Sequence, residues 1–357
     1  MDFLRKAAIG VYKKLETDRH ELSYLFFEIT RRCNLACRHC GSDCTSVTSA
    51  AELTADSWVK IARYVADRFG TSPAVVITGG EPLVHPEILR IGQGIRDAGL
   101  RWGMVTNGWL LTQERLTELQ EAGMISITVS LDGLSATHDS LRGRAGSRDR
   151  AMQALEYIAA SGIPHHDAVT CVYPDNLGEL DAVARDLVEA GVKAWRLFRV
   201  FPLGRARDDE SLKLDRESTR AMLDWVASAR KRYAPLGLRI NYSCEGYMPL
   251  ALDRSVRDFP FFCRAGINIA SILADGSVTG CSNNRSRFYV GNVLRDDFTE
   301  LWENGFSVFR DRSWAKDGRC GTCREFKKCG GSSIHLWNDG KRDIEFCYCG
   351  ENGSPVA

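Results

Sequence analysis

The chain has 357 residues, enough for one large domain and a smaller one, and its 47 lysines and arginines nearly balance its 46 aspartates and glutamates. This charge balance gives no reason to expect a nucleic acid or a membrane surface as partner. No apolar run approaches the ~20 residues of a membrane span, and charged residues interrupt the N-terminus too early for a secretory signal. Only Cys171 lies between the cysteines of the first 44 residues and those of the last 114, a distribution that favours metal centres in a reducing cytoplasm over a disulfide framework.

The predicted elements begin with an N-terminal extension, residues 1–22, whose apolar residues recur at helical spacing and predict a packing helix. From residue 23 to residue 205, strand-like and helix-like segments alternate. Strands are expected over 24–30, 73–78, 101–106, 125–131, 167–173 and 194–200, and helices over 53–69, 86–98, 112–122, 148–161 and 176–190. Six such βα units predict a right-handed parallel α/β architecture, a partial (β/α)6 TIM-like barrel with its sites at the C-terminal ends of the strands.

The composition changes after this alternation. Residues 206–260 are expected to form a bridging region with one amphipathic helix around 215–233. Residues 261–357 hold seven cysteines, a number that packing alone explains poorly. We therefore expect a small C-terminal cysteine-rich iron–sulfur domain.

Three cysteines follow the first predicted strand with the spacing C-x3-C-x2-C: Cys33, Cys37 and Cys40. Three thiolates on one tight loop can hold three irons of a [4Fe-4S] cluster, because soft sulfur ligands suit iron–sulfur sites. The fourth iron then lacks a protein ligand, and an open position on a metal usually binds and transforms a ligand. A zinc site and buried structural thiols are the alternatives.

The loop resembles the cluster loop of the radical S-adenosylmethionine (radical SAM) superfamily, with His39 as the aromatic-type residue before the last cysteine. The resemblance implies that the open iron chelates the amino and carboxylate groups of the methionine moiety of SAM. The second strand is followed by Gly79, Gly80 and Glu81, which resemble the GGE motif that receives the amino group in this family. Glycines let a ligand approach the backbone, and the carboxylate can accept hydrogen bonds from an ammonium group.

The third and fourth predicted strands end in polar turns. The third ends at Asn107, and the fourth runs into S-L-D-G, followed by H-D and R-G, as in the radical SAM family. The resemblance implies that Ser130 and Arg142 bind the SAM carboxylate, while Asn107 or Asp132 contacts the ribose or shapes the pocket. An arginine can grip a carboxylate through two hydrogen bonds. Asp132 is also compatible with a simple turn or cap residue, and Asp139 is expected to be such a turn or cap residue.

The C-terminal cysteines resemble the SPASM domain of peptide-modifying radical SAM enzymes, C-x9–15-G-x4-C, gap, C-x2-C-x5-C-x3-C, gap, C. Six of the seven positions match, and Ser333 stands in place of one cysteine. The resemblance assigns one auxiliary cluster to Cys320, Cys323, Cys329 and Cys347. Cys263 and Cys281 would serve a second, with Cys349 or Cys244 replacing the missing ligand; a cluster with an open iron, no second cluster and a zinc knuckle are the alternatives.

The resemblance implies an enzyme that uses an external low-potential electron donor, such as flavodoxin or ferredoxin, to cleave SAM. The 5′-deoxyadenosyl radical would then abstract a hydrogen atom from a substrate. The auxiliary clusters would carry electrons away from the substrate radical or bind the substrate directly.

The expected substrate is a ribosomally made peptide, crosslinked or epimerised with or without a separate recognition protein. Cys171 and Cys244, outside the cluster patterns, are candidate hydrogen-atom donors for epimerisation, unless they are small buried side chains like the expected bystander Cys44. Ser282 follows Cys281 where the anaerobic sulfatase maturase has an aspartate base, which argues against that activity. The alternatives are a dehydrogenase or epimerase of a sugar, a cyclitol or another small molecule, and a non-catalytic iron–sulfur electron carrier that does not cleave SAM.

Overall fold

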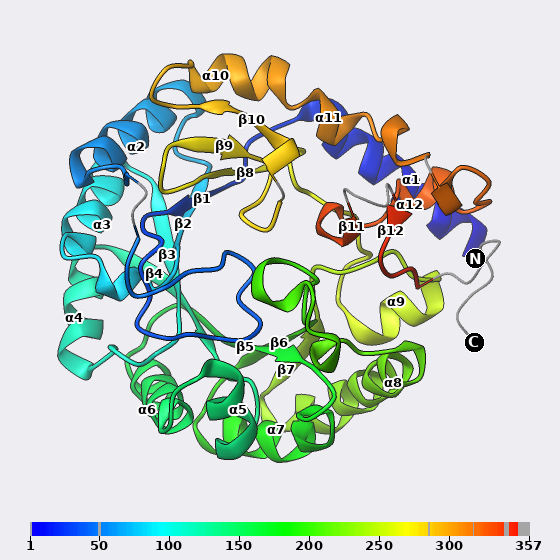
Figure 1. Cartoon of the computed structure of the whole chain (residues 1–357), viewed down its shortest axis with the longest axis horizontal. Coiled ribbons are helices and arrows are strands. Elements are labelled where there is room, and N and C mark those ends of the chain that lie inside the picture. The colour runs from blue at the N-terminus through cyan, green and yellow to red at the C-terminus, as the bar shows by residue number, and fades with distance from the viewer. Residues whose placement is uncertain (1, 49–50, 285, 317, 339–342, 349–357) are drawn as a thin grey trace.

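Strands and helices alternate along this chain, and the helices form a ring outside a curved sheet (Figure 1). The computed structural model describes residues 2–48, 51–284, 286–316, 318–338 and 343–348. Within these residues the sheet has the strand order β10-β9-β8-β1-β2-β3-β4-β5-β6-β7. All pairs from β8 through β1 to β7 are parallel, whereas β8, β9 and β10 pair antiparallel. The predicted α/β fold with a partial TIM-like barrel is therefore confirmed.

The barrel is built from strands near the positions that the sequence predicts, with one addition. Its strands are β1 (Tyr24–Glu28), β2 (Ala74–Thr78), β3 (Arg101–Thr106), β4 (Met124–Ser130), β5 (His165–Val172), β6 (Ala194–Arg199) and β7 (Arg239–Tyr242). The helices that alternate with them are α2 (Ala55–Phe69), α3 (Ile88–Asp97), α4 (Gln113–Glu121), α5 (Ser135–Arg142), α6 (Ser147–Ala160), α7 (Leu180–Glu189) and α8 (Arg216–Tyr233). The short helix α5 is not predicted, because its residues belong to the polar segment that follows the fourth strand.

The region predicted as a bridge, residues 206–260, contains the expected helix as α8 and also supplies β7. This strand pairs in parallel with β6, from Ala194 opposite Arg239 to Leu197 opposite Tyr242. Its four residues are too few to show a hydrophobic period of their own. The barrel sheet therefore extends one strand beyond the six predicted units.

The C-terminal part of the chain joins the same sheet on its other side. Strand β8 (Ile269–Ile272) pairs in parallel with β1, and β9 (Ser277–Thr279) and β10 (Tyr289–Asn292) continue outward from it. The remaining elements are α9 (Leu250–Val256), α10 (Phe298–Glu300), α11 (Ser307–Arg310), α12 (Phe326–Cys329), β11 (Trp337–Asn338) and β12 (Asp343–Ile344). The predicted N-terminal helix, α1 (Asp2–Arg19), contacts this part, since Lys13 Nζ donates to the Lys328 carbonyl at 3.3 Å.

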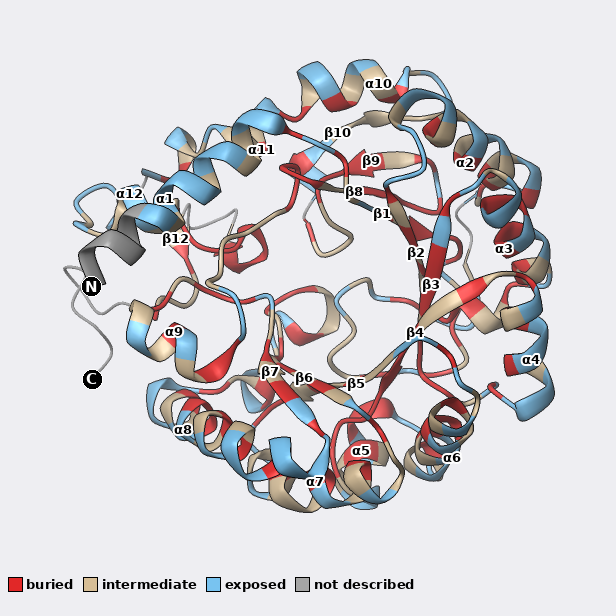
Figure 2. Cartoon of the chain, turned by 180° about the vertical axis from the view of Figure 1, so that it is seen from behind, coloured by how far each residue is buried: buried red, intermediate tan, exposed pale blue. Residues whose placement is uncertain are grey.

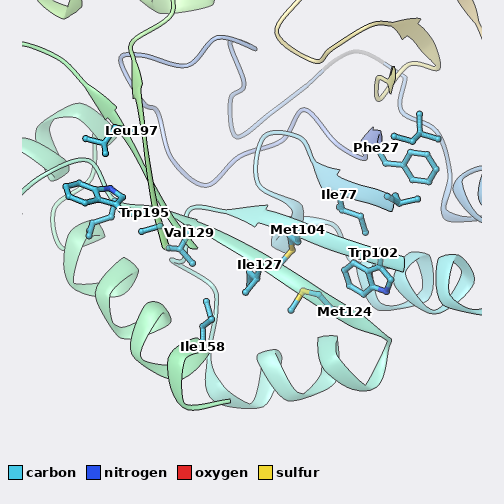
Figure 3. Packing of buried hydrophobic residues seen from close by; sticks show 14 of the residues in the cluster. Phe27, Ile77, Trp102, Met104, Met124, Ile127, Val129, Ile158, Trp195 and Leu197 are labelled. Atoms are coloured by element: carbon cyan, nitrogen blue, oxygen red, sulfur yellow. The ribbon is translucent and has the colours of Figure 1, made fainter. Parts of the chain in front are cut away.

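The two faces of the barrel sheet differ in polarity because side chains alternate along each strand. Buried apolar side chains such as Ile127, Trp195 and Leu197 pack outward against the helices (Figure 3). In Figure 2 the strands are largely buried, and the exposed residues gather on the outer surfaces of the helices. No helix in the described residues is long and apolar enough to cross a membrane. The inner face of the barrel is left for polar side chains.

Candidate active site

The C-x3-C-x2-C loop lies between β1 and α2, at the C-terminal end of β1, and it crosses the centre of the helix ring (dark blue in Figure 1). The Cys33 N–H donates to the Thr45 carbonyl at 2.7 Å and closes the base of the loop. Cys33, Cys37 and Cys40 pack with Leu35 and with the side chains of Cys44 and Trp109. The structure therefore gathers the three predicted ligand thiols at the mouth of the barrel.

Neighbouring strand-end loops hold this loop through close backbone contacts at glycines. The Gly80 N–H donates to the Thr30 carbonyl at 2.8 Å, and the Glu81 N–H donates to the Arg32 carbonyl at 3.0 Å. A Cβ on Gly79 or Gly80 would collide with the carbonyl oxygen of Thr30 or Arg32. At the Cβ positions of these glycines the space is taken by the backbone of the cluster loop, and the approach of a ligand to their backbone stays a prediction.

Arg205, which follows β6, was not predicted as a site residue. Its Nε donates to the Cys37 carbonyl at 2.7 Å, its Nη1 donates to the Cys44 carbonyl at 2.9 Å, and its N–H donates to the Cys40 carbonyl at 3.0 Å. Gly204 has φ +54°, and a Cβ there would collide with the Cys40 carbonyl oxygen. The sequence signal was the P-L-G-R turn at a strand end, a position where barrel sites are built.

The thiols of the loop differ in acidity. Burial raises the pKa of Cys33 to about 11 and also raises that of Cys37. The pKa of Cys40 is lowered to about 6, because its sulfur accepts hydrogen bonds from the Cys44 thiol and from the Cys44 N–H at 3.4 Å. Cys44, expected to be a bystander, thus supports a ligand. All described cysteines are free. An all-sulfur donor set of this kind fits an iron–sulfur cluster, whose iron binds thiolates.

The GGE carboxylate is fully buried and turned toward β3. Glu81 accepts hydrogen bonds from the Thr106 hydroxyl at 2.7 Å and from the Asn107 N–H at 2.7 Å. Burial raises its pKa, and these hydrogen bonds oppose that rise. The Asn107 amide in turn donates to the Asn34 side chain in the cluster loop at 2.8 Å. The structure brings Gly79, Gly80, Glu81 and Asn107 together beside the thiols, and their contacts to SAM stay predictions.

Asp132 and Arg142 form a buried ion pair after β4. Arg142 Nε lies 2.6 Å and Nη2 lies 2.5 Å from Asp132 Oδ2, and Arg142 Nη1 donates to Cys37 Sγ at 3.8 Å. Burial alone would raise the pKa of Asp132, but the charge of Arg142, together with His39, His138 and the hydrogen bond from the Cys171 N–H, lowers it. The guanidinium predicted to bind the SAM carboxylate therefore already has an anionic partner. Ser130, at the end of β4, lies two residues from Asp132.

Two further groups complete this end of the site. His39 Nε2 lies 3.8 Å from Asp132 Oδ2, and burial lowers the His39 pKa to about 4, so the ring is neutral. The Cys171 N–H donates to Asp132 Oδ1 at 2.7 Å, and ligand atoms of His39, Asp132 and Cys171 all lie within 4.8 Å of one another. Of the two hydrogen-donor candidates, Cys171 therefore lies at the predicted SAM site. Asp139 caps α6, as expected, by accepting from the Gly146 and Arg148 N–H groups.

The four thiols assigned to one auxiliary cluster also lie together. Burial raises the pKa of Cys320 to about 12, and the thiols of Cys329, Cys347 and Cys323 add to the rise. Cys320 and Cys347 pack with Leu336, Trp337 and Ile344 in a small core of their own. Buried thiolates close to one another repel, which keeps these thiols protonated in the free protein. A bound metal would favour the thiolate form, because a metal deprotonates the thiols that coordinate it. Cys349 lies outside the described residues, and the ligand assignments stay predictions.

Comparisons with known proteins match both parts of the chain. Residues 27–187 match the Radical SAM superfamily, and residues 263–324 match an iron–sulfur cluster-binding domain, SPASM. The AdoMet-dependent heme synthase of Methanosarcina barkeri is 31% identical, and the match covers 85% of this chain and 89% of that protein. The PqqA peptide cyclase of Rhizobium meliloti is 26% identical, and the match covers 84% of this chain and 79% of that protein. Streptococcus suis SuiB bound to S-adenosylmethionine has the same fold, with a TM-score of 0.69, 18% identity and coverage of 92% of this chain and 77% of that one.

The two domain matches and the two groups of thiols agree with each other. They imply a [4Fe-4S] cluster that binds SAM in the barrel and auxiliary clusters in the C-terminal part. The matches disfavour the zinc sites and the non-catalytic electron carrier, because the barrel matches a family of radical enzymes and the C-terminal part matches an iron–sulfur cluster-binding domain. The chain belongs to the radical SAM superfamily and carries a SPASM-type auxiliary-cluster domain after its barrel.

Proposed function

We propose that this enzyme abstracts a hydrogen atom from a ribosomally made peptide bound in the mouth of the barrel, as a step of crosslinking or epimerisation. The observation that supports it best is the convergence of the strand-end groups on one loop. Glu81, Asn107 and the Asp132–Arg142 pair surround the loop of Cys33, Cys37 and Cys40. Each comes from a different strand end, which is the arrangement of active sites in such barrels.

The roles of these residues follow from their chemistry. Cys33, Cys37 and Cys40 would hold the cluster, and Glu81 would accept hydrogen bonds from the methionine amino group. Arg142 would bind the methionine carboxylate while Asp132 keeps the guanidinium in place. When bound, the cluster would supply the electron for reductive cleavage of SAM, the chemistry that leads to removal of a hydrogen atom from the substrate.

The inner face of the barrel offers polar contacts for a peptide. Arg196 forms an ion pair with Asp167, and its Nη2 donates to the Thr128 hydroxyl at 3.1 Å. The residues next to them in the strands, Ile127, Ala168 and Trp195, are buried in the core outside the sheet. Because successive side chains of a strand point to opposite faces, Thr128, Asp167 and Arg196 lie on the inner face. A relative that is named a peptide cyclase supports the peptide substrate.

A tetrapyrrole is the second candidate substrate. The observation in its favour is the heme synthase relative, whose identity and coverage exceed those of the peptide cyclase. Arg196 would serve such a substrate by binding a side-chain carboxylate. We also propose a low-potential donor such as flavodoxin or ferredoxin as electron source and a reducing cytoplasm as setting, which suits the free thiols.

The test is an anaerobic assay with reconstituted enzyme, dithionite and SAM. We expect 5′-deoxyadenosine, and we expect the Cys33→Ala, Cys37→Ala, Cys40→Ala triple variant to form none while its C-terminal iron stays bound. An intact cluster that releases no 5′-deoxyadenosine would contradict the enzyme assignment. Deuterium in the 5′-deoxyadenosine from a deuterated candidate peptide supports the peptide substrate, and deuterium only from a deuterated tetrapyrrole refutes it.

A further inference from the structure

A cavity of about 630 Å³ lies between α1 and the C-terminal part of the chain. Its walls come mainly from α1, from the segment 247–263 that contains α9, and from the segments 309–312 and 325–332 near α11 and α12. Figures 1 and 2 both show α1, α9 and α12 on one side of the molecule, whereas the cluster loop crosses the centre of the helix ring. The volume is within the range of small-molecule sites, about 300–1,000 Å³.

The cavity is not the space for a metal centre. Of the cysteines expected to hold auxiliary clusters, Cys263 and Cys329 line it, one from each predicted group. The other described candidates for these groups do not line it: Cys244, Cys281, Cys320, Cys323 and Cys347. A cluster needs its thiolates around one point, so a cluster on either group would lie beside the cavity. The space between the two groups is left for another ligand.

Most of the cavity wall is apolar. Phe262 and Phe309 contribute aromatic rings, and Ile9, Met248 and Ile267 contribute aliphatic side chains. Removing apolar surface from water is favourable, so such a wall takes up a ligand with an apolar body. Sites for small molecules usually combine a wall of this kind with a few polar groups that orient the ligand.

One ammonium group lies within this wall. Lys13 Nζ is 5.6 Å from the ring centre of Tyr247 and 5.8 Å from that of Phe262, and it donates to the Lys328 carbonyl at 3.3 Å. All four residues line the cavity. Aromatic faces attract a cation, but they leave its charge uncompensated. The ammonium is therefore placed to bind an anion that enters the cavity.

The carboxylates of the cavity do not supply that anion. Each has a cationic partner of its own: Asp18 with Lys14 at 2.6 Å, Asp253 with Arg257 at 3.2 Å, and Glu325 with Lys328 at 2.8 Å. Arg312, which also lines the cavity, donates from Nε to the Phe309 carbonyl at 2.8 Å, while its buried Nη1 has no hydrogen-bond partner in the described residues. Burying such a group without a partner costs free energy that an anionic ligand would recover.

We propose that this cavity binds a small carboxylic acid with an apolar body, the carboxylate beside Lys13 and the body against the rings of Phe262 and Phe309. A strongly acidic partner is disfavoured, because Asp18, Asp253 and Glu325 would repel it. None of the groups placed around the SAM site lines the cavity. Binding here is therefore separate from hydrogen abstraction and does not depend on whether the substrate of that reaction is a peptide or a tetrapyrrole.

Calorimetry on the full-length, anaerobically reconstituted protein without SAM tests this site, with 4-phenylbutyrate as the probe. We expect 4-phenylbutyrate to bind, and we expect neither 4-phenyl-1-butanol, which lacks the carboxylate, nor a hexaglutamate peptide, which lacks the apolar body, to bind as tightly. Absence of 4-phenylbutyrate binding would overturn the proposal. Equal affinity for the alcohol would refute the role of the carboxylate, and equal affinity for hexaglutamate would point to an acidic partner instead.

Variants of α1 locate the binding. We expect Lys13→Met to weaken 4-phenylbutyrate binding about tenfold, because a charged hydrogen bond is lost. Lys14→Met is the matched control, since Lys14 is exposed and paired with Asp18, and it should bind as the wild type does. Equal effects of the two variants would overturn the site. If Lys13→Met misfolds by circular dichroism, Ile9→Glu decides, because a carboxylate in the wall should abolish binding, and unchanged affinity refutes the proposal.

Discussion

Replacing Arg205 by alanine tests how the cluster loop is held. The backbone N–H and two side-chain nitrogens of Arg205 reach the loop. The two side-chain bonds, at 2.7 Å to the Cys37 carbonyl and 2.9 Å to the Cys44 carbonyl, lie on either side of Cys40 in the chain. Its ion pair with Asp43 at 2.9 Å involves an exposed carboxylate and contributes little. The two carbonyl bonds therefore carry the effect.

The magnitude follows from the number and exposure of these bonds. A hydrogen bond to a charged group contributes about 1.5–3 kcal/mol. The Arg205 side chain is 27% exposed, so water can replace part of each lost bond. Taking the low end for both bonds and allowing for this replacement gives about 2 kcal/mol, or roughly a 30-fold larger population of the open loop.

Hydrogen exchange measures that population directly. The Cys33 and Cys40 N–H groups bond within the loop, and we expect their exchange in Arg205→Ala to be roughly 30-fold faster. Iron should also be lost faster to a chelator. Arg207→Ala is the control, because Arg207 lies two residues on and is exposed. Unchanged protection in Arg205→Ala, or equal loss in Arg207→Ala, would refute the reasoning.

Two further predictions concern the same end of the barrel. Gly204→Ala adds a Cβ against the Cys40 carbonyl at a positive φ, so we expect reduced iron incorporation while Gly178→Ala, where nothing lies near the added atom, reconstitutes normally. Burial raises the pKa of Glu28 from 4.5 to about 7, so its contribution to stability is full below pH 4.5 and is lost as the pH rises through 7. Thermal melts from pH 4.5 to 8 should show a loss of about 3 kcal/mol that Glu28→Gln removes; a variant with the wild-type pH slope would contradict this.

The strands β1 to β6 and the polar turns after them could be predicted because their signals are local. A buried parallel strand is a short apolar run, and C-x3-C-x2-C, G-G-E and S-L-D-G are spaced within single loops. The same locality explains what was missed. The functional part of Arg205 is its contact with carbonyls more than 150 residues earlier, and nothing beside it in the chain indicates that contact. The four residues of β7 show no period, and only their pairing with β6 makes them a strand.

By itself the sequence determined the chemistry of the site, because sulfur ligands, a buried carboxylate and an arginine at set spacings restrict what a loop can bind. Only the tertiary structure decided which groups share a site. Asp132 holds Arg142, Gly80 gives room to the cluster loop, and Arg205 donates hydrogen bonds to the carbonyls of Cys37 and Cys44. Apart from the Asp132–Arg142 pair, these partners are distant in sequence, and their meeting depends on how the strands curl into a barrel, which no local pattern encodes.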